Sequence, residues 1–249
     1  MGDIAIVRLS GLSSVEKKRV AKALLSELKN VRVVTEQEGG IEGDFRLRKL
    51  RHLAGERRTM TLHRENGCAF KVDIARCYFS PRLSTERLRV ARLVGPEERV
   101  LNMFAGVGPF SIPIAKAARA EVVSCEVNEF AAKLHVENNK LNKVDDLVTV
   151  VEGDASDLPE LVSGRFDRVI MPLPSDADKF LHVALRMTKK GGTIHYYRHL
   201  LGENKAEAAK ALRAELAGLL PPRTKYEVRK VREVGPRWVE MAAEIRVPR

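Results

Sequence analysis

Cysteine, tryptophan and glutamine are scarce in this chain of 249 residues, which holds three cysteines, one tryptophan and one glutamine. Cys68, Cys77 and Cys125 form no CxxC pair and no cysteine–histidine set at metal-ligand spacing, so neither a zinc site nor a disulfide framework is expected. We predict reduced thiols, as in a cytoplasmic protein, and no bound metal. The shortage of glutamine beside abundant glutamate, lysine and arginine is typical of heat-adapted proteins.

The chain also lacks long apolar runs. None approaches the ~18 residues that a membrane-spanning helix needs, so no membrane contact is expected. The N-terminal segment "MGDIAIVRLSG" turns polar too soon for a signal peptide. The length suits one large domain or two unequal ones, and 44% hydrophobic with 31% charged residues is the balance of a globular protein. A cytoplasmic monomer is expected.

Positive charge is in excess, because 44 Lys and Arg face 33 Asp and Glu, for a net charge of +11. Such a balance favours a polyanionic partner, since phosphates attract lysine and arginine and release counterions. The alternative is a solvated basic surface. Much of the charge lies in "FRLRKLRHLAGERR" (45–58), which follows the glycine-rich "EGGIEGD". We predict a long loop here that contacts a ligand.

Two unequal parts are predicted along the chain. Residues 1–75 combine two strands, a helix that ends near residue 29 and a hairpin around Asn66-Gly67, a strong turn signal. They are expected to form a small α+β domain, which carries the basic segment and would therefore face a polyanionic partner such as RNA. Residues 76–249 are expected to form the second domain. Its first segment, 76–96, is a linker with a helix that starts near Leu83 and ends at Gly95-Pro96.

Strands and helices alternate in the second part. Strand patterns occur at "RVLNMF", "EVVSCEV", "LVTVVEG", "FDRVIM" and "GGTIHYY", with helical patterns between them. This alternation predicts an α/β fold whose parallel sheet is covered on both faces. Two late strands, "KYEVRKVREV" and "WVEMAAEIRV", predict an antiparallel pair at one edge. His195, Tyr196 and Tyr197 lie on a central strand and are expected in the core rather than in a site.

The segment "NMFAGVGPF" (102–110) predicts a strand, a glycine turn and a helix start. Gly106 and Gly108 would let the backbone approach a ligand closely. Dinucleotide binding is the rival interpretation, but the third glycine of its fingerprint is absent. Glu126 ends the next strand, where an acid can accept both ribose hydroxyls. Asp154 and Ala155 follow the third strand and suit an adenine ring. Together they predict a nucleoside site, against the alternative of ordinary surface acids.

Longer motifs carry a resemblance to a known family. The segments "GGIEGDFRLRKLRHLAGE", "FKVDIARCYFSPRLSTER", "FAGVGPFSIPIA" and "GGTIHYY" resemble the archaeal and eukaryotic tRNA (guanine-N1) methyltransferases, and the resemblance covers almost the whole chain. It implies a class I S-adenosylmethionine-dependent methyltransferase with a Rossmann-like sheet. It also implies methyl transfer to N1 of the guanosine 3′ of the anticodon (position 37), with the anticodon stem-loop of tRNA as the partner.

The resemblance further implies roles for individual residues. Guanine N1 carries a proton at neutral pH, so the reaction needs a base, and a donor for the charge that builds on O6. Glu86 would be the base and Arg46 the O6 partner, while Arg87 would hold the cofactor carboxylate and Tyr78 would pack near its methionine arm. Other cofactor contacts would be Phe104, Gly106, Val107, Gly108, Glu126, Val127, Asp154, Ala155, Pro172 and Leu173, and tRNA contacts would be Arg46, Arg48, Lys49, Arg51 and Arg82.

Two positions depart from the family pattern. Asn102 stands where the first strand usually ends in Asp, and Pro172 stands where an Asn usually precedes the proline. Because Pro172 offers no side-chain amide, a weakly catalytic tRNA-binding paralogue is one alternative. The other is a wybutosine-pathway enzyme on the same nucleotide, by aminocarboxypropyl transfer or methylation of a wyosine precursor. Arg82-Leu83 and Pro109-Phe110 resemble the methyltransferase version rather than the aminocarboxypropyl version.

Overall fold

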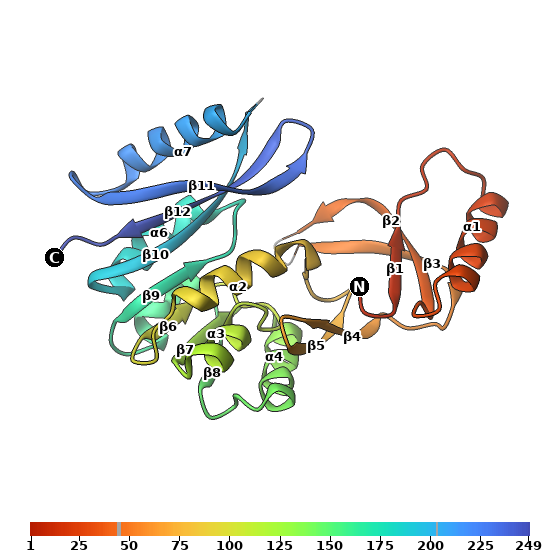
Figure 1. Ribbon diagram of the computed structural model, residues 1–249, viewed down its shortest axis with the longest axis horizontal. Coiled ribbons are helices and arrows are strands. Elements are labelled where there is room, and N and C mark those ends of the chain that lie inside the picture. Colours follow the sequence, from red (N-terminus) through yellow and green to blue (C-terminus); the bar gives the residue numbers. More distant parts are fainter. Residues whose placement is uncertain (44–45, 203) are drawn as a thin grey trace.

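The computed structural model describes residues 1–43, 46–202 and 204–249 (Figure 1). The N-terminal part holds a three-stranded sheet in the order β1-β2-β3, in which β2 pairs in parallel with β1 and antiparallel with β3. Helix α1 packs against this sheet and begins after Ser13, whose hydroxyl and the carboxylate of Glu16 form a capping box. The elements are β1 (Ile4–Val7), α1 (Ser14–Glu27), β2 (Val33–Glu42) and β3 (Leu47–Gly55).

The basic segment is a strand rather than a loop. The long loop predicted for 45–58 is wrong over Leu47–Gly55, which forms β3 and pairs with β2. Leu50 packs against the main core and Leu53 against the small core beneath α1, so the segment has apolar anchors between its arginines. Backbone pairing with β2 supplies the rest of the stabilisation. Phe45, the first residue of the segment, lies outside the described residues.

The predicted hairpin consists of β4 (Met60–Glu65) and β5 (Cys68–Asp73). Its turn residues Asn66 and Gly67 have φ angles of 49° and 69°, and a type I′ turn needs positive φ at both positions. Hydrogen bonds join the hairpin to helix α4 (Glu129–Asn142) of the C-terminal part, because the side-chain amides of Asn138 and Asn142 exchange hydrogen bonds with the backbone of β5. It therefore connects the two parts of the molecule.

The large sheet has seven strands in the order β11-β12-β10-β9-β6-β7-β8. Strands β6 to β10 run parallel, and β12 is antiparallel to both β10 and β11. The predicted α/β sheet and its antiparallel edge pair are confirmed. The strands are β6 (Arg99–Asn102), β7 (Glu121–Glu126), β8 (Val148–Glu152), β9 (Phe166–Met171), β10 (Thr188–Leu201), β11 (Lys225–Gly235) and β12 (Trp238–Arg246).

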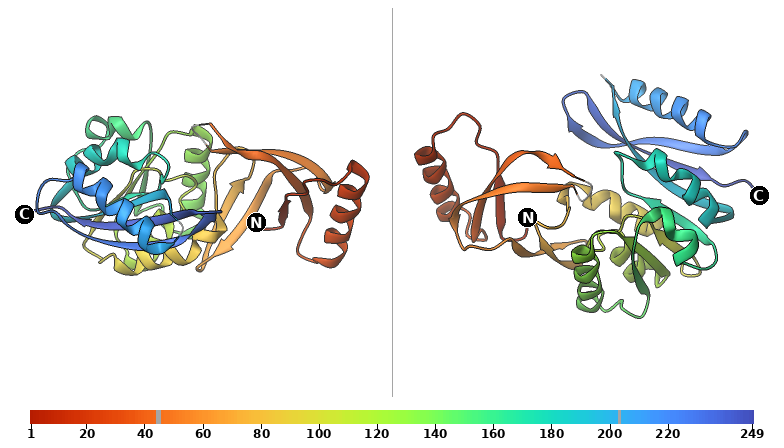
Figure 2. Two further views of the ribbon diagram at one scale, coloured as in Figure 1. Left: turned by 90° about the horizontal axis from the view of Figure 1, so that it is seen from above. Right: turned by 180° about the vertical axis from the view of Figure 1, so that it is seen from behind.

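Helices cover both faces of this sheet (Figure 2). Residues of α2, α3 and α4 enter the core on one face, and residues of α5, α6 and α7 enter the core on the other. Within the described ranges, each helix is too short or too polar to cross a bilayer. The helices are η1 (Pro81–Leu83), α2 (Ser84–Leu93), α3 (Ser111–Ala118), α4 (Glu129–Asn142), η2 (Ala155–Asp157), α5 (Leu158–Leu161), α6 (Ala177–Met187) and α7 (Lys205–Leu219).

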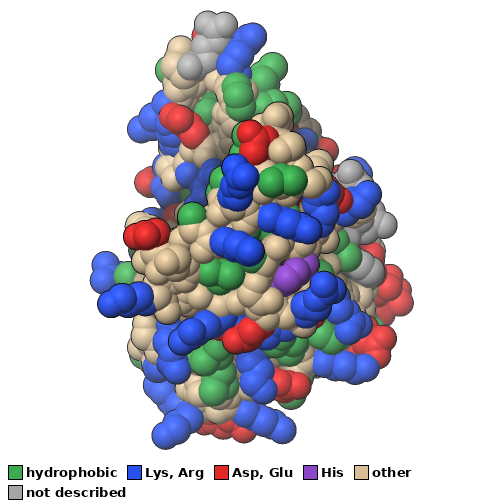
Figure 3. Space-filling view, turned by 90° about the vertical axis from the view of Figure 1, so that its right-hand side faces the viewer, with side chains coloured by type: hydrophobic (Ala, Val, Ile, Leu, Met, Phe, Trp, Pro, Cys, Tyr) green, Lys and Arg blue, Asp and Glu red, His purple; other side chains and the backbone are tan. Residues whose placement is uncertain are grey.

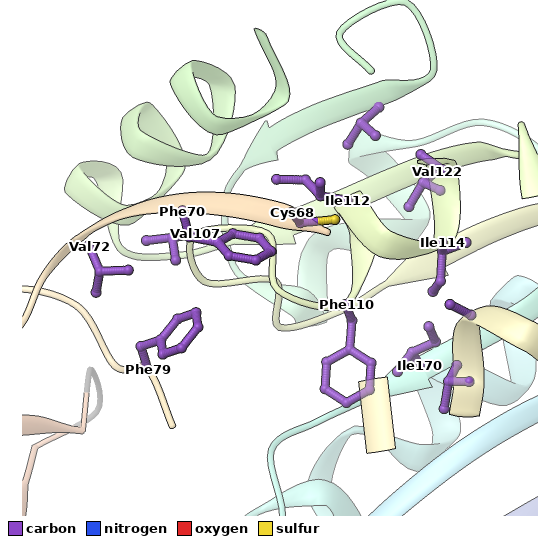
Figure 4. Packing of buried hydrophobic residues seen from close by; sticks show 14 of the residues in the cluster. Cys68, Phe70, Val72, Phe79, Val107, Phe110, Ile112, Ile114, Val122 and Ile170 are labelled. Atoms are coloured by element: carbon purple, nitrogen blue, oxygen red, sulfur yellow. The ribbon is translucent and has the colours of Figure 1, made fainter. Parts of the chain in front are cut away.

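Successive residues of β10 enter different cores, as the alternation of a strand requires. Tyr197 belongs to the cluster on the α2 face, and Tyr196 belongs to the cluster on the α7 face. Figure 4 shows how side chains of β5 and α3 meet in the first cluster. His195, Tyr196 and Tyr197 are all buried, with 1%, 0% and 1% exposure, so the predicted core position is confirmed. The prediction that none of them belongs to a site is wrong for Tyr197, which also lines the cavity described below.

Gly108 lies in the turn before α3 with a left-handed φ of 93°. A Cβ at this position would lie 2.5 Å from the imidazole of His135 and 2.8 Å from Ile112. His135 is fully buried, and burial lowers the pKa of its imidazole to about 3, so the neutral ring packs here without access to solvent. Position 108 therefore has neither the space nor the backbone conformation for a side chain.

Gly108→Ala is expected to lower the free energy of unfolding by about 2–4 kcal/mol, because overpacking adds to backbone strain. The control is Gly218→Ala in α7, where no atom lies within 4 Å of the added carbon. That change should raise the free energy of unfolding by about 0.5–1 kcal/mol. Urea unfolding measures both variants, and a wild-type free energy for Gly108→Ala would contradict the prediction.

Candidate active site

A cavity of about 820 Å³ lies at the carboxyl ends of the parallel strands. Ligands bind at this edge in open α/β sheets. Residues from the N-terminal part and from β10, β11 and β12 complete its wall. The sequence-predicted site residues that line it are Arg46, Tyr78, Phe104, Gly106, Glu126, Val127, Asp154, Ala155, Pro172 and Leu173.

Glu126 holds the glycine turn in place. One carboxylate oxygen accepts the N–H of Gly106 at 2.6 Å, and the other accepts the N–H of Asn128 at 2.9 Å. Burial raises the pKa of this carboxyl, and the backbone N–H groups oppose that rise. Each oxygen has a second lone pair. The carboxylate can therefore also accept the hydroxyl groups of a ribose in the cavity.

The neighbouring strand end suits an adenine ring. The Asp154 carboxylate uses Oδ1 to accept the N–H of Ser156 at 2.7 Å, and its other oxygen can accept from an amino group. Ala155 is buried in the wall. Phe104 and Phe180 meet edge to face with ring centroids 5.1 Å apart, and both line the cavity. A carboxylate, small residues and aromatic rings together fit an adenosine.

Two glycine-turn residues predicted to bind the cofactor, Val107 and Gly108, are not among the residues that line the cavity in the described structure. Val107 is fully buried, and its carbonyl accepts the side-chain amide of Asn138 at 3.0 Å. Gly108 packs against His135 instead. Both residues shape the turn from behind, so a direct cofactor contact gets no support from this geometry.

Arg87 is also absent from the described cavity lining. Its guanidinium is 2% exposed, donates to Glu65 at 2.5 Å and donates to the carbonyl of Ser80 at 3.0 Å. It also stacks over the ring of Phe79, 4.6 Å from the centroid. These contacts tie the "SPRL" segment to the hairpin. Glu65 is the carboxylate that pairs with Arg87 in the structure, and a contact with the cofactor carboxylate stays a prediction.

Glu86, the predicted base, lies behind the cavity wall. It is 5% exposed, and its Oε1 accepts the hydroxyl of Tyr197 at 2.5 Å. The same carboxylate pairs with Arg89 at 3.0 Å and with Arg229. Tyr197 lines the cavity, whereas Glu86 is absent from the described lining. One tyrosine therefore separates the predicted base from the cavity.

Arg46 joins the N-terminal part to the loop that follows β9. Its Nη1 donates to the hydroxyl of Ser175 at 2.8 Å, and its guanidinium lies over the ring of Tyr78, 5.2 Å from the centroid. All three residues line the cavity. The Nε of Arg46 is buried and has no hydrogen-bond partner among the described residues. A ligand oxygen in the cavity could supply one.

The other residues predicted to contact tRNA differ in their exposure and in the groups that they already contact. Lys49 and Arg82 are exposed, although Arg82 also donates to a carbonyl of β11 at 3.3 Å. Arg48 turns inward and donates to the carbonyl of Phe79 at 3.0 Å. Arg51 pairs with two glutamates of β2. Figure 3 shows lysine and arginine spread over the side of the molecule that carries the N-terminal sheet.

The structure gives a reason for one departure from the family pattern. Asn102 is fully buried and donates to the hydroxyl of Ser111 at 3.0 Å, which also accepts the hydroxyl of Ser124 at 2.8 Å. A neutral amide suits these hydroxyl partners, whereas an aspartate would bury a charge there without a cation. Pro172 does line the cavity, and the polar side chains that its loop offers there are those of Ser175 and Asp176.

Sequence reasoning missed three residues at the far end of the cavity: Tyr197, Arg232 and Glu240. Arg232 donates to Glu240 at 2.6 Å. Burial opposes ionisation of Glu240, but His199 and Arg232 outweigh it and lower its pKa. The antiparallel register places His199, Glu240 and Arg232 abreast on three strands. No local motif marks this arrangement, because it depends on strand pairing.

Sequence models of two families match the chain, the TRM5/TYW2 methyltransferase domain over residues 61–216 and the TYW2 N-terminal domain over residues 1–59. The tRNA (guanine(37)-N(1))-methyltransferase Trm5b of Pyrococcus abyssi is 44% identical over 197 residues, which are 79% of this chain and 58% of that protein. This chain thus spans less than three fifths of that relative.

A second relative matches along nearly its whole length. The tRNA (guanine(37)-N(1))/4-demethylwyosine(37)-methyltransferase Taw22 of Nanoarchaeum equitans is 30% identical, with 95% of each chain covered. Among solved structures, Methanocaldococcus jannaschii Trm5 in complex with adenosine has a TM-score of 0.82 and 34% identity, covering 100% of this chain and 73% of that chain. The similarity therefore extends over both parts of the molecule.

Proposed function

Because this chain belongs to the TRM5/TYW2 methyltransferase family, we propose that it transfers a methyl group from S-adenosylmethionine to N1 of the guanosine at position 37 of tRNA. The observation that carries this proposal is a single cavity with two different ends. One end is lined by the acids Glu126 and Asp154, which would bind the nucleoside, and the other by Arg46 and Tyr197, whose hydroxyl bonds to Glu86 behind the wall. The names of the P. abyssi and N. equitans relatives both specify guanine 37, which supports the choice of this position in tRNA.

The residues present fit S-adenosylmethionine. Glu126 would accept the ribose hydroxyls and Asp154 the adenine amino group. At Gly106, an added Cβ would meet just the carbonyl of Tyr78, at 3.8 Å, so the backbone stays open to the methionine arm. When bound, the cofactor supplies an electrophilic methyl group. The protein's own task is to orient the acceptor nitrogen toward it and to exclude water.

Arg46 and Glu86 carry the acid–base chemistry in this proposal. Glu86 takes the proton that leaves N1, which frees the lone pair for attack. The guanidinium of Arg46 stabilises the charge that builds on O6. The hydroxyl of Ser175, in the loop that contains Pro172, accepts a hydrogen bond from that guanidinium and fixes its position. An arginine anchored in this way could supply the recognition that the missing amide supplies elsewhere in the family.

The target base must leave the anticodon-loop stack to enter the cavity. A loop base is unpaired, so extraction costs less than from a duplex. We propose that Lys49, Arg51 and Arg82 bind backbone phosphates around it and that Arg48 instead supports Tyr78, over whose ring it lies 5.6 Å from the centroid. With a net charge of +11, binding should weaken steeply as salt concentration rises.

The test uses purified protein, labelled S-adenosylmethionine and unmodified tRNA transcripts with guanosine or adenosine at position 37, followed by nucleoside mass spectrometry. We expect 1-methylguanosine from the guanosine transcript and no product from the adenosine transcript. Absence of any methylated nucleoside, with cofactor binding intact by calorimetry, would refute the proposal and favour a tRNA-binding role.

A second candidate rests on the dual name of the N. equitans relative, which also acts on 4-demethylwyosine. The same assay on tRNA that carries 4-demethylwyosine separates the reactions. A methylated tricyclic base would show wyosine-precursor activity, and an added aminocarboxypropyl group would show the sister reaction by its larger mass. Product from the guanosine transcript alone would support the first candidate.

A further inference from the structure

Tyr197 stands between the cavity and the predicted base. Tyr197 lines the cavity from β10, one residue beyond the last residue of this strand that pairs with β9, and its ring centroid lies 5.9 Å from that of Phe110. Its hydroxyl lies 2.5 Å from Oε1 of Glu86. The carboxylate itself is buried on α2 between Arg89 and Arg229. A base in the cavity thus meets the tyrosine before it meets the glutamate.

We propose that the proton of guanine N1 reaches Glu86 through the hydroxyl of Tyr197, an inference that rests on the proposed function. The N1–H bond breaks and its proton joins the tyrosine oxygen, while the tyrosine's own proton passes to Oε1 of Glu86. The N1 electron pair forms the bond to the methyl carbon. The methyl–sulfur bond breaks, and its electron pair stays on sulfur. Tyr197 ends the step neutral, and Glu86 ends it protonated.

The surroundings of Tyr197 suit a relay rather than a base. Burial, followed by the charge of Glu86, raises the pKa of the hydroxyl well above its ordinary value, and Arg229 and Arg89 oppose this. The hydroxyl therefore stays protonated and can accept a proton just as it gives one away. The charged groups that face it come from α2 (Glu86 and Arg89) and β11 (Arg229).

The chain contains its own control for this pair. Tyr196, the preceding residue, donates its hydroxyl to Oε1 of Glu215 at 2.5 Å. It is as buried as Tyr197, but it faces the opposite core and is absent from the described cavity lining. Tyr196→Phe removes a tyrosine–glutamate bond of the same length without touching the cavity. If the role of Tyr197 were purely structural, Tyr197→Phe and Tyr196→Phe would change the methylation rate to a similar extent.

The experiment measures single-turnover methylation of the guanosine-37 transcript by the full chain with Tyr197→Phe, Glu86→Gln, the double variant and Tyr196→Phe. Tyr197→Phe should slow the reaction about 10²-fold with cofactor affinity unchanged, and Tyr196→Phe should stay near the wild-type rate. The double variant should be no slower than the slower single variant, because both act in one pathway. Both single defects should shrink as pH rises toward the range in which guanine N1 ionises by itself.

Several results would overturn the relay. A wild-type rate for Tyr197→Phe would do so, and so would effects of Tyr197→Phe and Glu86→Gln that multiply in the double variant. If the Tyr197→Phe protein fails to fold, the methylation rate of the wild type is measured instead in mixtures of H₂O and D₂O. A rate that depends on the fraction of D₂O along a curve supports the movement of two protons in one step, and a linear dependence contradicts the relay. No 1-methylguanosine from the wild type would instead remove the proposed function itself.

Discussion

Glu86→Gln is expected to slow methyl transfer to guanosine 37 about 10²–10⁴-fold, with the affinity for S-adenosylmethionine nearly unchanged. Glutamine keeps the size of the side chain and an oxygen that can accept the hydroxyl of Tyr197, but it cannot take up a proton. Single-turnover rates at saturating tRNA measure the chemical step, and calorimetry with S-adenosylmethionine measures binding.

The matched control is Glu215→Gln. Glu215 also accepts a tyrosine hydroxyl and pairs with an arginine, Arg198, but it does so on the opposite face of the sheet. Both variants remove a carboxylate that pairs with arginine, so both should lose stability. Thermal unfolding measures this loss in each protein and separates it from an effect on the rate. The Glu215 variant should retain the wild-type rate. A Glu86→Gln protein that loses cofactor affinity instead would move Glu86 from proton transfer to cofactor binding.

Glu126→Ala is expected to weaken S-adenosylmethionine binding about 100-fold or more. The substitution removes the acceptor proposed for two ribose hydroxyls, and each charge-assisted hydrogen bond contributes about 1.5–3 kcal/mol. It also frees the N–H groups of Gly106 and Asn128 that shape the turn. Calorimetry measures the loss, and saturating cofactor should restore much of the methylation rate.

Glu152→Ala is the control for this change, because Glu152 is exposed and lies opposite Glu126 in the strand pairing. Its removal should leave cofactor affinity near the wild-type value. Acidification offers a second measurement. Burial raises the pKa of Glu126, so the ionised acceptor should be lost at a higher pH than for an ordinary glutamate, and affinity should fall with it. Equal losses in both variants would contradict a ribose role for Glu126.

Much of the fold could be predicted because its signals are local. The Asn66-Gly67 turn, the glycine turn before α3 and the alternation of strands with helices all depend on neighbouring residues. The basic segment was predicted wrongly for the converse reason. Its leucines pack against α1 and the main core, contacts that lie far away along the chain. The domain boundary near residue 75 stays a prediction.

By itself, the sequence determined the order of the elements, the family resemblance and the nucleoside end of the cavity, since strand-end acids such as Glu126 and Asp154 follow the chain's own periodicity. The tertiary structure alone decided which residues meet at the end of the cavity that we propose for the target base. Glu86 and Tyr197 are 111 residues apart and Arg46 and Ser175 are 129 apart, yet each pair is hydrogen-bonded. Helix packing and the order of strands in the sheet create these contacts, and no local pattern encodes either.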